Sequence, residues 1–218
     1  MQSSKRNQIE EAIAAALQQA DREPAADLRI RLKRLLDTDT TLGRKPGVDE
    51  PEQGSAFSTG ERPGRGVEVW FSPYEAFALL LGLLLLEHRW PQQTAVRIMR
   101  QARPALEPEH ARILSLDPKA LFDEKEVKEQ AAPGRAAVGS GAPVFLAIVS
   151  GGRAERNDSE AHPHAVQVCR GEEDLMRFRR ERAPVGTSMT VLELTAPAHL
   201  LAYCLNQTKA KTRGRAGR

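Results

Sequence analysis

One stretch of this sequence is almost entirely apolar, and it constrains the fold more than any other feature. Ala76 to Leu86 holds eleven consecutive apolar or glycine residues, and Glu75 and Glu87 close the run at its two ends. A helix that crosses a membrane needs roughly 20 apolar residues. The run therefore predicts a buried core helix that is apolar on all sides, rather than a membrane span.

The residues at the start of this helix are typical of a capped N-terminus. Ser72 can accept a hydrogen bond as the cap, Pro73 suits the first helical position, and Glu75 completes a capping box. The preceding stretch, Val67 to Phe71, is β-branched and aromatic and predicts a strand. We expect the helix to run from Ser72 to His88.

The sequence before this helix predicts a helical hairpin followed by a loop. Apolar residues recur every four positions from Lys5 to Ala20, which indicates an amphipathic helix. From Ala25 to Asp37 the leucines fall on one helical face and the basic residues mostly on the others. Residues 42 to 66 are rich in Gly, Pro, Ser and acidic residues, so we expect a flexible loop there.

The sequence after this helix predicts shorter helices. Gln92 to Gln101 has an apolar side, Pro104 is expected to end that helix, and Glu107 to Leu114 is expected to form another. A charged stretch from 117 to 130 follows. Residues 131 to 142 have the composition of a flexible linker, so we place a domain boundary there.

The periodicity changes in the C-terminal part of the chain. Strands are predicted at Val144 to Val149, Ala165 to Cys169 and Met189 to Leu194. Helices are predicted at Glu172 to Arg182 and Pro197 to Asn206. The order β-β-α-β-α describes a small α+β module.

Together these elements predict an α+β fold with a mainly helical N-terminal domain around the buried apolar helix. The expected organisation is a helical hairpin with a basic second helix (1–41), a flexible loop (42–66), a helical core domain (67–130), a linker (131–142), the α+β module (143–206) and a disordered basic tail (207–218).

Composition narrows the class of protein. Apolar residues make up 40% of the chain and charged residues 28%, which is ordinary for a globular protein. Two cysteines, Cys169 and Cys204, are too few for a disulfide framework, and we expect buried free thiols. The polar start MQSSKRNQIEE does not resemble a secretory signal, so a cytoplasmic location is the expectation.

Patterns for catalysis or metal binding are weak. His162 and His164 with Cys169 have ligand chemistry, but their spacing fits no closed zinc pattern and a fourth ligand is missing. The turn Ser150-Gly151-Gly152 lacks the lysine of a phosphate-binding loop, and no G-x-S-x-G motif occurs. We therefore expect no catalytic residue, metal or cofactor. An enzyme whose site is assembled from scattered residues stays an alternative.

Basic residues gather in three places although the formal net charge is only +3. Long cationic side chains on an exposed helix can contact phosphates, although such charge runs often only solubilise a surface. The candidates for DNA contact lie in the predicted second helix and the loop after it: Arg29, Arg31, Lys33, Arg34, Arg44 and Lys45. The candidates in the basic tail are Lys209, Lys211, Arg213, Arg215 and Arg218.

The stretch VWFSPYEAFALLLGLLLLEHRWPQQTAVRIMR (69–100) resembles the second half of the MerR-type winged-helix regulators. In that family a wing strand leads into a capped helix, a turn with an aromatic residue, and another helix. The residues that match are Phe71, Ser72, Glu75, Trp90 and Ile98. The family's N-terminal helix-turn-helix and its Arg-Tyr-Tyr run have no counterpart here. The resemblance implies that Ala25 to Asp37 is a recognition helix and Gly43 to Val69 a long wing.

Two functional hypotheses follow. The first is a non-enzymatic, DNA-contacting transcriptional regulator, with duplex DNA as its partner and a homodimer formed through sheet edges as a candidate assembly. The second is an interaction or assembly adaptor that does not bind nucleic acid. It rests on the all-apolar helix, which needs cover on every side and leaves room for a partner if this chain does not supply it.

Overall fold

The computed structural model describes residues 3–17, 24–42, 54–58, 69–122, 141–150 and 165–209. Their helices and strands are, in chain order, β1 (Ser4–Lys5), α1 (Arg6–Ala16), α2 (Ala26–Leu42), β2 (Trp70–Phe71), α3 (Pro73–Glu87), α4 (Gln92–Ser115), α5 (Pro118–Leu121), β3 (Val144–Ser150), β4 (Ala165–Arg170), α7 (Gly171–Arg182), β5 (Ser188–Glu193) and α8 (Thr195–Gln207). The fold is mixed helix and strand, as the sequence predicts.

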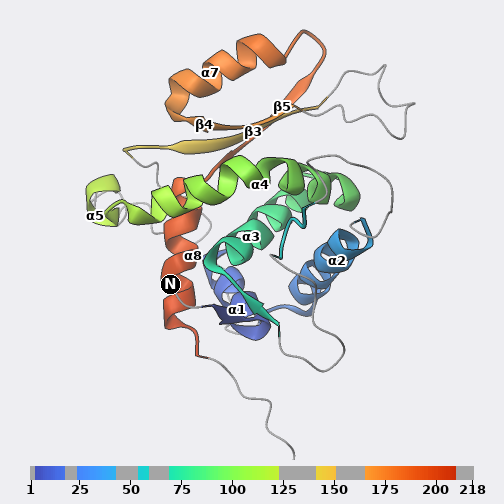
Figure 1. The fold of residues 1–218 in the computed structure, drawn as a ribbon, viewed down its shortest axis with the longest axis vertical. Coiled ribbons are helices and arrows are strands. Elements are labelled where there is room, and N and C mark those ends of the chain that lie inside the picture. Colours follow the sequence, from blue (N-terminus) through green and yellow to red (C-terminus); the bar gives the residue numbers. More distant parts are fainter. Residues whose placement is uncertain are drawn as a thin grey trace, which may run out of the picture.

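The larger sheet is antiparallel with the strand order β4-β3-β5. Figure 1 shows α7 above this sheet, α4 running beneath it, and the remaining long helices below α4. A second, two-stranded sheet pairs β1 with β2, so that Ser4 lies opposite Phe71. This small sheet holds the start of the chain beside the residues that lead into α3.

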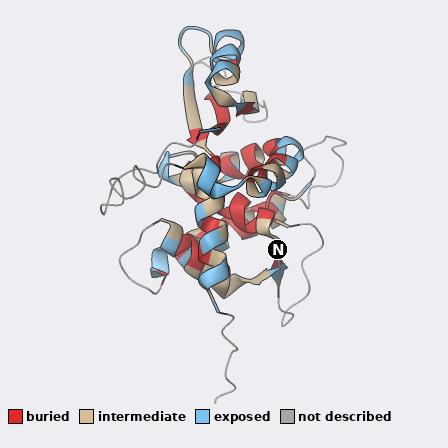
Figure 2. Cartoon of the chain, turned by 90° about the vertical axis from the view of Figure 1, so that its left-hand side faces the viewer, coloured by how far each residue is buried: buried red, intermediate tan, exposed pale blue. Residues whose placement is uncertain are grey.

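The apolar helix α3 forms as predicted and is covered by this chain. The Ser72 hydroxyl accepts a hydrogen bond from the Glu75 N–H at 3.2 Å, and the Glu75 carboxylate accepts one from the Ser72 N–H at 2.6 Å. The side chains from Tyr74 to Leu83 are all buried, and Leu84 and Leu86 pack against the core. Figure 2 shows this helix at the buried centre of the molecule.

The helices α2, α4 and α8 all contact α3, so the described part of this chain buries most of its apolar surface, and Leu84 and Leu86 stay partly exposed. Within the described residues, no helix combines the length and the apolar character that crossing a membrane requires.

Helix α4 corrects one prediction. Pro104 was expected to end a helix, with a second one from Glu107 to Leu114, yet a single helix runs from Gln92 to Ser115 with Pro104 and Pro108 inside it. Both prolines are exposed, whereas Leu106 between them and Ile113 beyond them are fully buried. The burial of this apolar side offsets the two backbone hydrogen bonds that the prolines cannot donate.

The segment 54–58 corrects a second prediction, since it lies in the stretch expected to be a flexible loop. Ala56 and Phe57 are fully buried. The ring of Phe57 lies against Gly82 of α3, where an added Cβ would come within 3.1 Å of Cζ. The absence of a side chain at Gly82 is therefore what lets this segment dock on α3. The rest of 43–68 lies outside the described residues.

The helices and the sheet share one apolar core. Along β3, Val144, Leu146 and Ile148 join the core of the helices, while Ala147 and Val149 join a second cluster beneath α7. Alternate strand residues point to opposite faces, which explains why the apolar run of β3 is continuous rather than alternating. The boundary expected at 131–142 therefore does not separate two hydrophobic cores.

Other element boundaries differ modestly from the predictions. Helix α1 ends at Ala16, and α2 continues past Asp37 to Leu42. Strand β2 comprises Trp70–Phe71, and residues 67 and 68 of the predicted strand lie outside the described residues. Of the charged stretch 117–130, the structure shows α5, and residues 123–130 lie outside the described residues.

Candidate nucleic-acid interface

The position of α2 is fixed by the leucines on one of its faces. Leu28, Leu32, Leu35 and Leu36 are buried in the core of the helices. Their spacing places them on one side of the helix, so the residues between them must lie on the other side. The basic residues of α2 are therefore held on the outside of the molecule by the burial of its leucines.

A buried ion pair anchors the C-terminal half of α2. Asp39 and Arg100 of α4 are both almost fully buried, and the guanidinium Nε donates to Oδ1 of Asp39 at 2.8 Å. The same carboxylate accepts from the N–H groups of Ala56 at 3.0 Å and Phe57 at 3.1 Å. One carboxylate thus joins α2, α4 and the docked segment 54–58.

A second arginine of α4 completes this anchor. Arg103 donates to the carbonyls of Ser55 and Ser58 and pairs with Glu107 at 3.1 Å. The backbone of the docked segment is therefore hydrogen-bonded from both sides, which satisfies groups that would otherwise be buried without partners.

Two of the four predicted basic residues on α2 have acidic neighbours. Arg31 pairs with Asp27 at 2.7 Å, and both side chains are exposed. The Nε of Arg29 lies 3.7 Å from a carboxylate oxygen of Glu10 on α1. The Arg31–Asp27 pair is exposed, and such pairs contribute little to stability. Glu10 is also paired with Arg6 at 2.8 Å, so Arg29 is not its only partner. Both arginines could therefore exchange these contacts for phosphates.

The other two, Lys33 and Arg34, are exposed and form no ion pair with any described residue. Between the cations lies Ile30, an exposed apolar side chain. This outer face of α2, which comprises Arg29, Ile30, Lys33 and Arg34, is called the basic face of α2 below.

The remaining predicted residues are not brought onto this face. Arg44 and Lys45 lie outside the described residues, and so do four of the five tail residues: Lys211, Arg213, Arg215 and Arg218. Lys209 is described and exposed, just beyond the end of α8. The carbonyl of Thr208 accepts a hydrogen bond from Gln8 of α1, and α1 lies between α8 and α2 (Figure 1).

Sequence reasoning missed the Asp39–Arg100 pair, although a signal was present. Asp39 follows Leu35 by four positions and Leu36 by three, so it continues the buried face of α2. Arg100 follows Val96 by four positions in the same way on α4. A charge at a core-facing helical position indicates a buried pair, because a lone buried charge is too costly.

The sequence also raised metal-binding histidines and two cysteines as candidates, and the described residues give these less support. Among the residues that the structure describes, no three His, Cys, Asp or Glu side chains are grouped to hold a metal ion. His162, His164 and the glycines of the Ser150 turn lie outside the described residues. Cys169 and Cys204 are free and buried, which confirms the prediction for both thiols, and burial raises the pKa of each.

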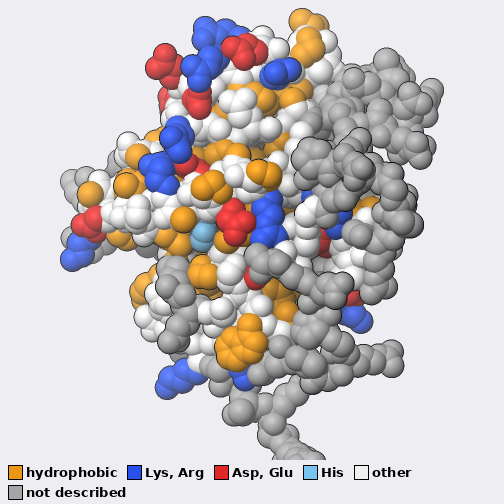
Figure 3. Space-filling view, viewed as in Figure 1, with side chains coloured by type: hydrophobic (Ala, Val, Ile, Leu, Met, Phe, Trp, Pro, Cys, Tyr) orange, Lys and Arg blue, Asp and Glu red, His pale blue; other side chains and the backbone are white. Residues whose placement is uncertain are grey.

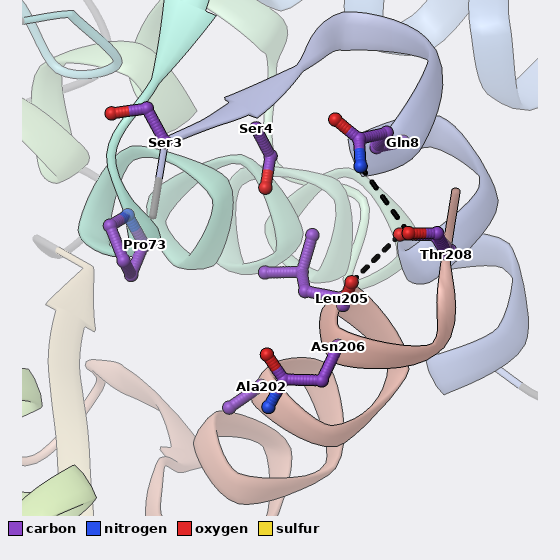
Figure 4. Close-up of a pocket in the computed structure, with 8 residues that line it drawn as sticks. All are labelled: Ser3, Ser4, Gln8, Pro73, Ala202, Leu205, Asn206 and Thr208. Atoms are coloured by element: carbon purple, nitrogen blue, oxygen red, sulfur yellow. Dashed lines mark hydrogen bonds between the residues drawn. The ribbon is translucent and has the colours of Figure 1, made fainter. Parts of the chain in front are cut away.

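One small pocket of about 190 Å³ lies where β1, α1, α3 and α8 meet (Figure 4). It is lined by Ser3, Ser4, Gln8, Pro73, Ala202, Leu205, Asn206 and Thr208. Its groups are hydroxyls, amides and apolar side chains, and none of them is ionisable. Ligand pockets are usually larger, at about 300 to 1,000 Å³, so this pocket is a weaker candidate than the basic face of α2.

Helix α7 also carries many charges, but of both signs. Its first turn is acidic, with Glu172, Glu173 and Asp174, and its last turn holds Arg179, Arg180 and Arg182. Figure 3 shows blue and red side chains interspersed over this helix, at the top of the view. Such an arrangement suits the helix dipole and a solvated surface.

The basic face of α2 can form charge-assisted hydrogen bonds to phosphate oxygens from a rigidly held helix. Comparison with known proteins adds no family to this description, since neither a family model, nor a curated protein, nor a solved structure matches the chain.

Proposed function

We propose that this protein is a DNA-contacting, regulator-like protein that binds duplex DNA through the basic face of α2. The observation that carries the proposal is that Lys33 and Arg34 are exposed and form no ion pair with a described residue, on a helix whose opposite side is anchored in the core. The proposal is of a binding protein and requires no catalytic group.

Rigidity supports this assignment. Helix α2 is fixed by four buried leucines and by the Asp39–Arg100 pair, so the backbone positions that carry its cations are set before DNA is bound. A preorganised surface loses less conformational freedom on binding than a flexible one. Contacts from such a helix to phosphates would set the position of the protein on the duplex.

The order of elements also supports it. The chain passes from β2 through the capped helix α3 and the turn at Trp90 to α4, which is the order on which the likeness to the MerR-type winged-helix regulators rests. As part of the proposal, α2 takes the place of the recognition helix, and the protein acts in the cytoplasm, where duplex DNA and reduced thiols are found.

A homodimer belongs to the same proposal. The outer strands of the larger sheet, β4 and β5, each have one edge that pairs with no described strand. Such edges can pair with a second copy. Light scattering at rising concentration tests this part by itself: a strict monomer would contradict the dimer and leave the DNA contact to be judged on binding.

The adaptor hypothesis stays the alternative. The feature that motivated it, an uncovered side of the helix from Ser72 to His88, gives it little support, because most of α3 is buried within this chain.

The test is binding of a labelled random-sequence duplex, measured by fluorescence anisotropy at low salt. Replacing Arg29, Lys33 and Arg34 together by Ala should weaken binding by about tenfold or more, because three phosphate contacts are lost. The matched control removes the same charge from α7 by replacing Arg179, Arg180 and Arg182 with Ala, and should bind nearly as wild type. Absence of binding at low salt, or equal effects of the two triple variants, would overturn the proposal.

A further inference from the structure

A group of aromatic and histidine side chains lies where α4 meets α3 and α8. His110 of α4 is 5% exposed, and its ring stacks on Phe77 of α3 with centroids 4.6 Å apart and an interplanar angle of 21°. Tyr74 meets the same imidazole edge-on at 6.0 Å. On the α8 side, the ring of His199 meets Phe122 edge-on at 5.9 Å. We call His110 and His199 with these three rings the histidine cluster.

Polar atoms in this cluster lack partners among the described residues. The Tyr74 hydroxyl and Nε2 of His199 are buried and make no hydrogen bond there. None of the hydrogen bonds among the described residues involves the imidazole of His110. A neutral imidazole tolerates such surroundings, whereas an imidazolium needs water or an acceptor to stabilise its charge.

We propose that protonation of the histidine cluster in mild acid opens the contact of α8 with α3 and α4. The cluster would then be a pH-sensitive element built into the fold, with α8 as its moving part. The proposal stands on the packing of the cluster and does not depend on DNA binding.

Burial lowers the pKa of both histidines, which is the direction that opening in acid requires. Burial, and to a smaller extent the neighbouring His199, lowers the pKa of His110 to about 4. Burial also lowers the pKa of His199, an effect that its hydrogen bond with the backbone of Ile113 partly offsets. Each histidine thus takes up its proton more readily when α8 is open than when it is closed.

The surrounding charges do not offset an imidazolium. The charged groups that act on Tyr74 are Arg103, Glu107 and Glu75. Glu109 precedes His110 in the chain, and Glu193 lies just before α8, which carries His199. Glu75 is held by the Ser72 N–H, Glu107 by Arg103, and Glu109 by Arg112 and Arg170.

Glu193 acts in the opposite sense to the histidines. Its carboxylate accepts hydrogen bonds from the N–H groups of Thr195 and Ala196 at the start of α8, and burial raises its pKa in spite of them. A raised carboxyl pKa means that the closed state takes up this proton more readily, so acid would favour closure at Glu193. Opening in acid must therefore come from the histidines.

The direction and the size of the expected pH effect on α8 opening follow from proton linkage. A histidine whose pKa is lowered in the closed state favours that state fully above about pH 6.5, and loses this contribution as the pH falls toward the lowered value. For His110 alone, the open fraction should rise roughly 30-fold between about pH 7.5 and pH 5.

The two cysteines provide probes in the protein as it exists. Cys204 is buried on α8, whereas Cys169 is buried in the separate cluster beneath α7. Labelling by a dipyridyl disulfide is measured against pH in two single-cysteine variants, Cys169→Ala and Cys204→Ala. Each rate is divided by that of the urea-unfolded chain at the same pH, which removes the intrinsic pH dependence of the thiol.

We expect the normalised labelling of Cys204 to rise roughly 30-fold as the pH falls from about 7.5 to 5, with Cys169 unchanged. His110→Phe keeps an aromatic ring on Phe77 without a titrating group, and His199→Gln keeps a donor for Ile113, so either should flatten the profile. His88→Gln, which changes an exposed histidine at the end of α3, should not.

Three outcomes would overturn the proposal: a Cys204 profile that stays flat, Cys169 and Cys204 labelled equally in acid, or an unchanged profile in both His110→Phe and His199→Gln. Equal labelling would mean global acid unfolding. The His199→Gln variant keeps the test decisive if His110→Phe does not fold.

Discussion

At the scale of single residues, Asp39 is a buried polar side chain that joins α2, α4 and the segment 54–58. Its carboxylate holds Arg100 of α4 and two backbone N–H groups of the segment 54–58. A buried ion pair is not by itself evidence of added stability, but removing one partner leaves the other charge buried and uncompensated. The consequence should therefore appear when one partner is changed alone.

Asp39→Asn should lower the free energy of unfolding by about 3 to 5 kcal/mol, because Arg100 is left without a counter-charge. Urea unfolding measures this loss. Asp27→Asn is the control, since that carboxylate forms an exposed pair with Arg31 and should cost about 0.5 kcal/mol or less. Similar small losses in the two variants would contradict the role assigned to Asp39.

Gly82 makes a second prediction at this scale. Replacing a glycine inside a helix by alanine usually stabilises by up to about 1 kcal/mol. Here the new Cβ would lie 3.1 Å from Phe57 and 3.2 Å from Leu35, which are both fully buried and cannot easily move. Because overpacking costs roughly 1 to 3 kcal/mol, Gly82→Ala should lower the thermal midpoint.

Phe57, the partner of Gly82 in this contact, provides the control experiment. In a Phe57→Leu background the smaller side chain leaves room for the Cβ, so Gly82→Ala should cost less there than in the wild type. If Gly82→Ala raised the midpoint in the wild-type chain, the docking of Phe57 on α3 would be wrong.

At the scale of elements, α3 could be predicted from sequence and α4 could not. The start of α3 is set by Ser72, Pro73 and Glu75, which interact within four residues of one another. The continuity of α4 through Pro104 depends on the burial of side chains beyond it, and this burial involves distant parts of the chain. Local signals therefore predict where a helix begins better than whether tertiary packing carries it past a proline.

The candidate site also has one part that the sequence could predict and one part that it could not. That the basic residues of α2 face outward follows from the spacing of its leucines, so sequence could predict it. The anchor at Asp39 joins residues 61 positions apart at Arg100 and 18 apart at Phe57. Such pairings are fixed by tertiary structure. In the sequence, the only sign of them is a charged residue at a core-facing helical position.

Helix α4 provides a prediction at this scale. Pro104→Ala and Pro108→Ala each restore an N–H donor inside the helix and remove no buried contact, because both prolines are exposed. Each change should raise the free energy of unfolding by about 1 to 2 kcal/mol. Pro118→Ala, at the start of α5 where no helical donor is missing, should give no gain. Equal effects at all three prolines would indicate that α4 is not continuous.

At the scale of the whole molecule, the shared core predicts one cooperative unfolding transition. β3 contributes side chains to the core of the helices on one face and to the cluster under α7 on the other. Circular dichroism of the helices and exposure of the Cys169 thiol should therefore give the same urea midpoint at neutral pH. Exposure of Cys169 at a clearly lower urea concentration would instead indicate two separately folding domains.

The most direct test of the central claim, that the basic face of α2 contacts DNA, is the salt dependence of binding to a random-sequence duplex. The slope of log K against log salt counts the phosphates neutralised, with about 0.9 per contact. Replacing Arg29, Lys33 and Arg34 together by Ala should reduce the magnitude of this slope by about 3, whereas the triple α7 variant should leave it unchanged. An unchanged slope in the α2 variant would contradict the claim, because binding would then come from another surface.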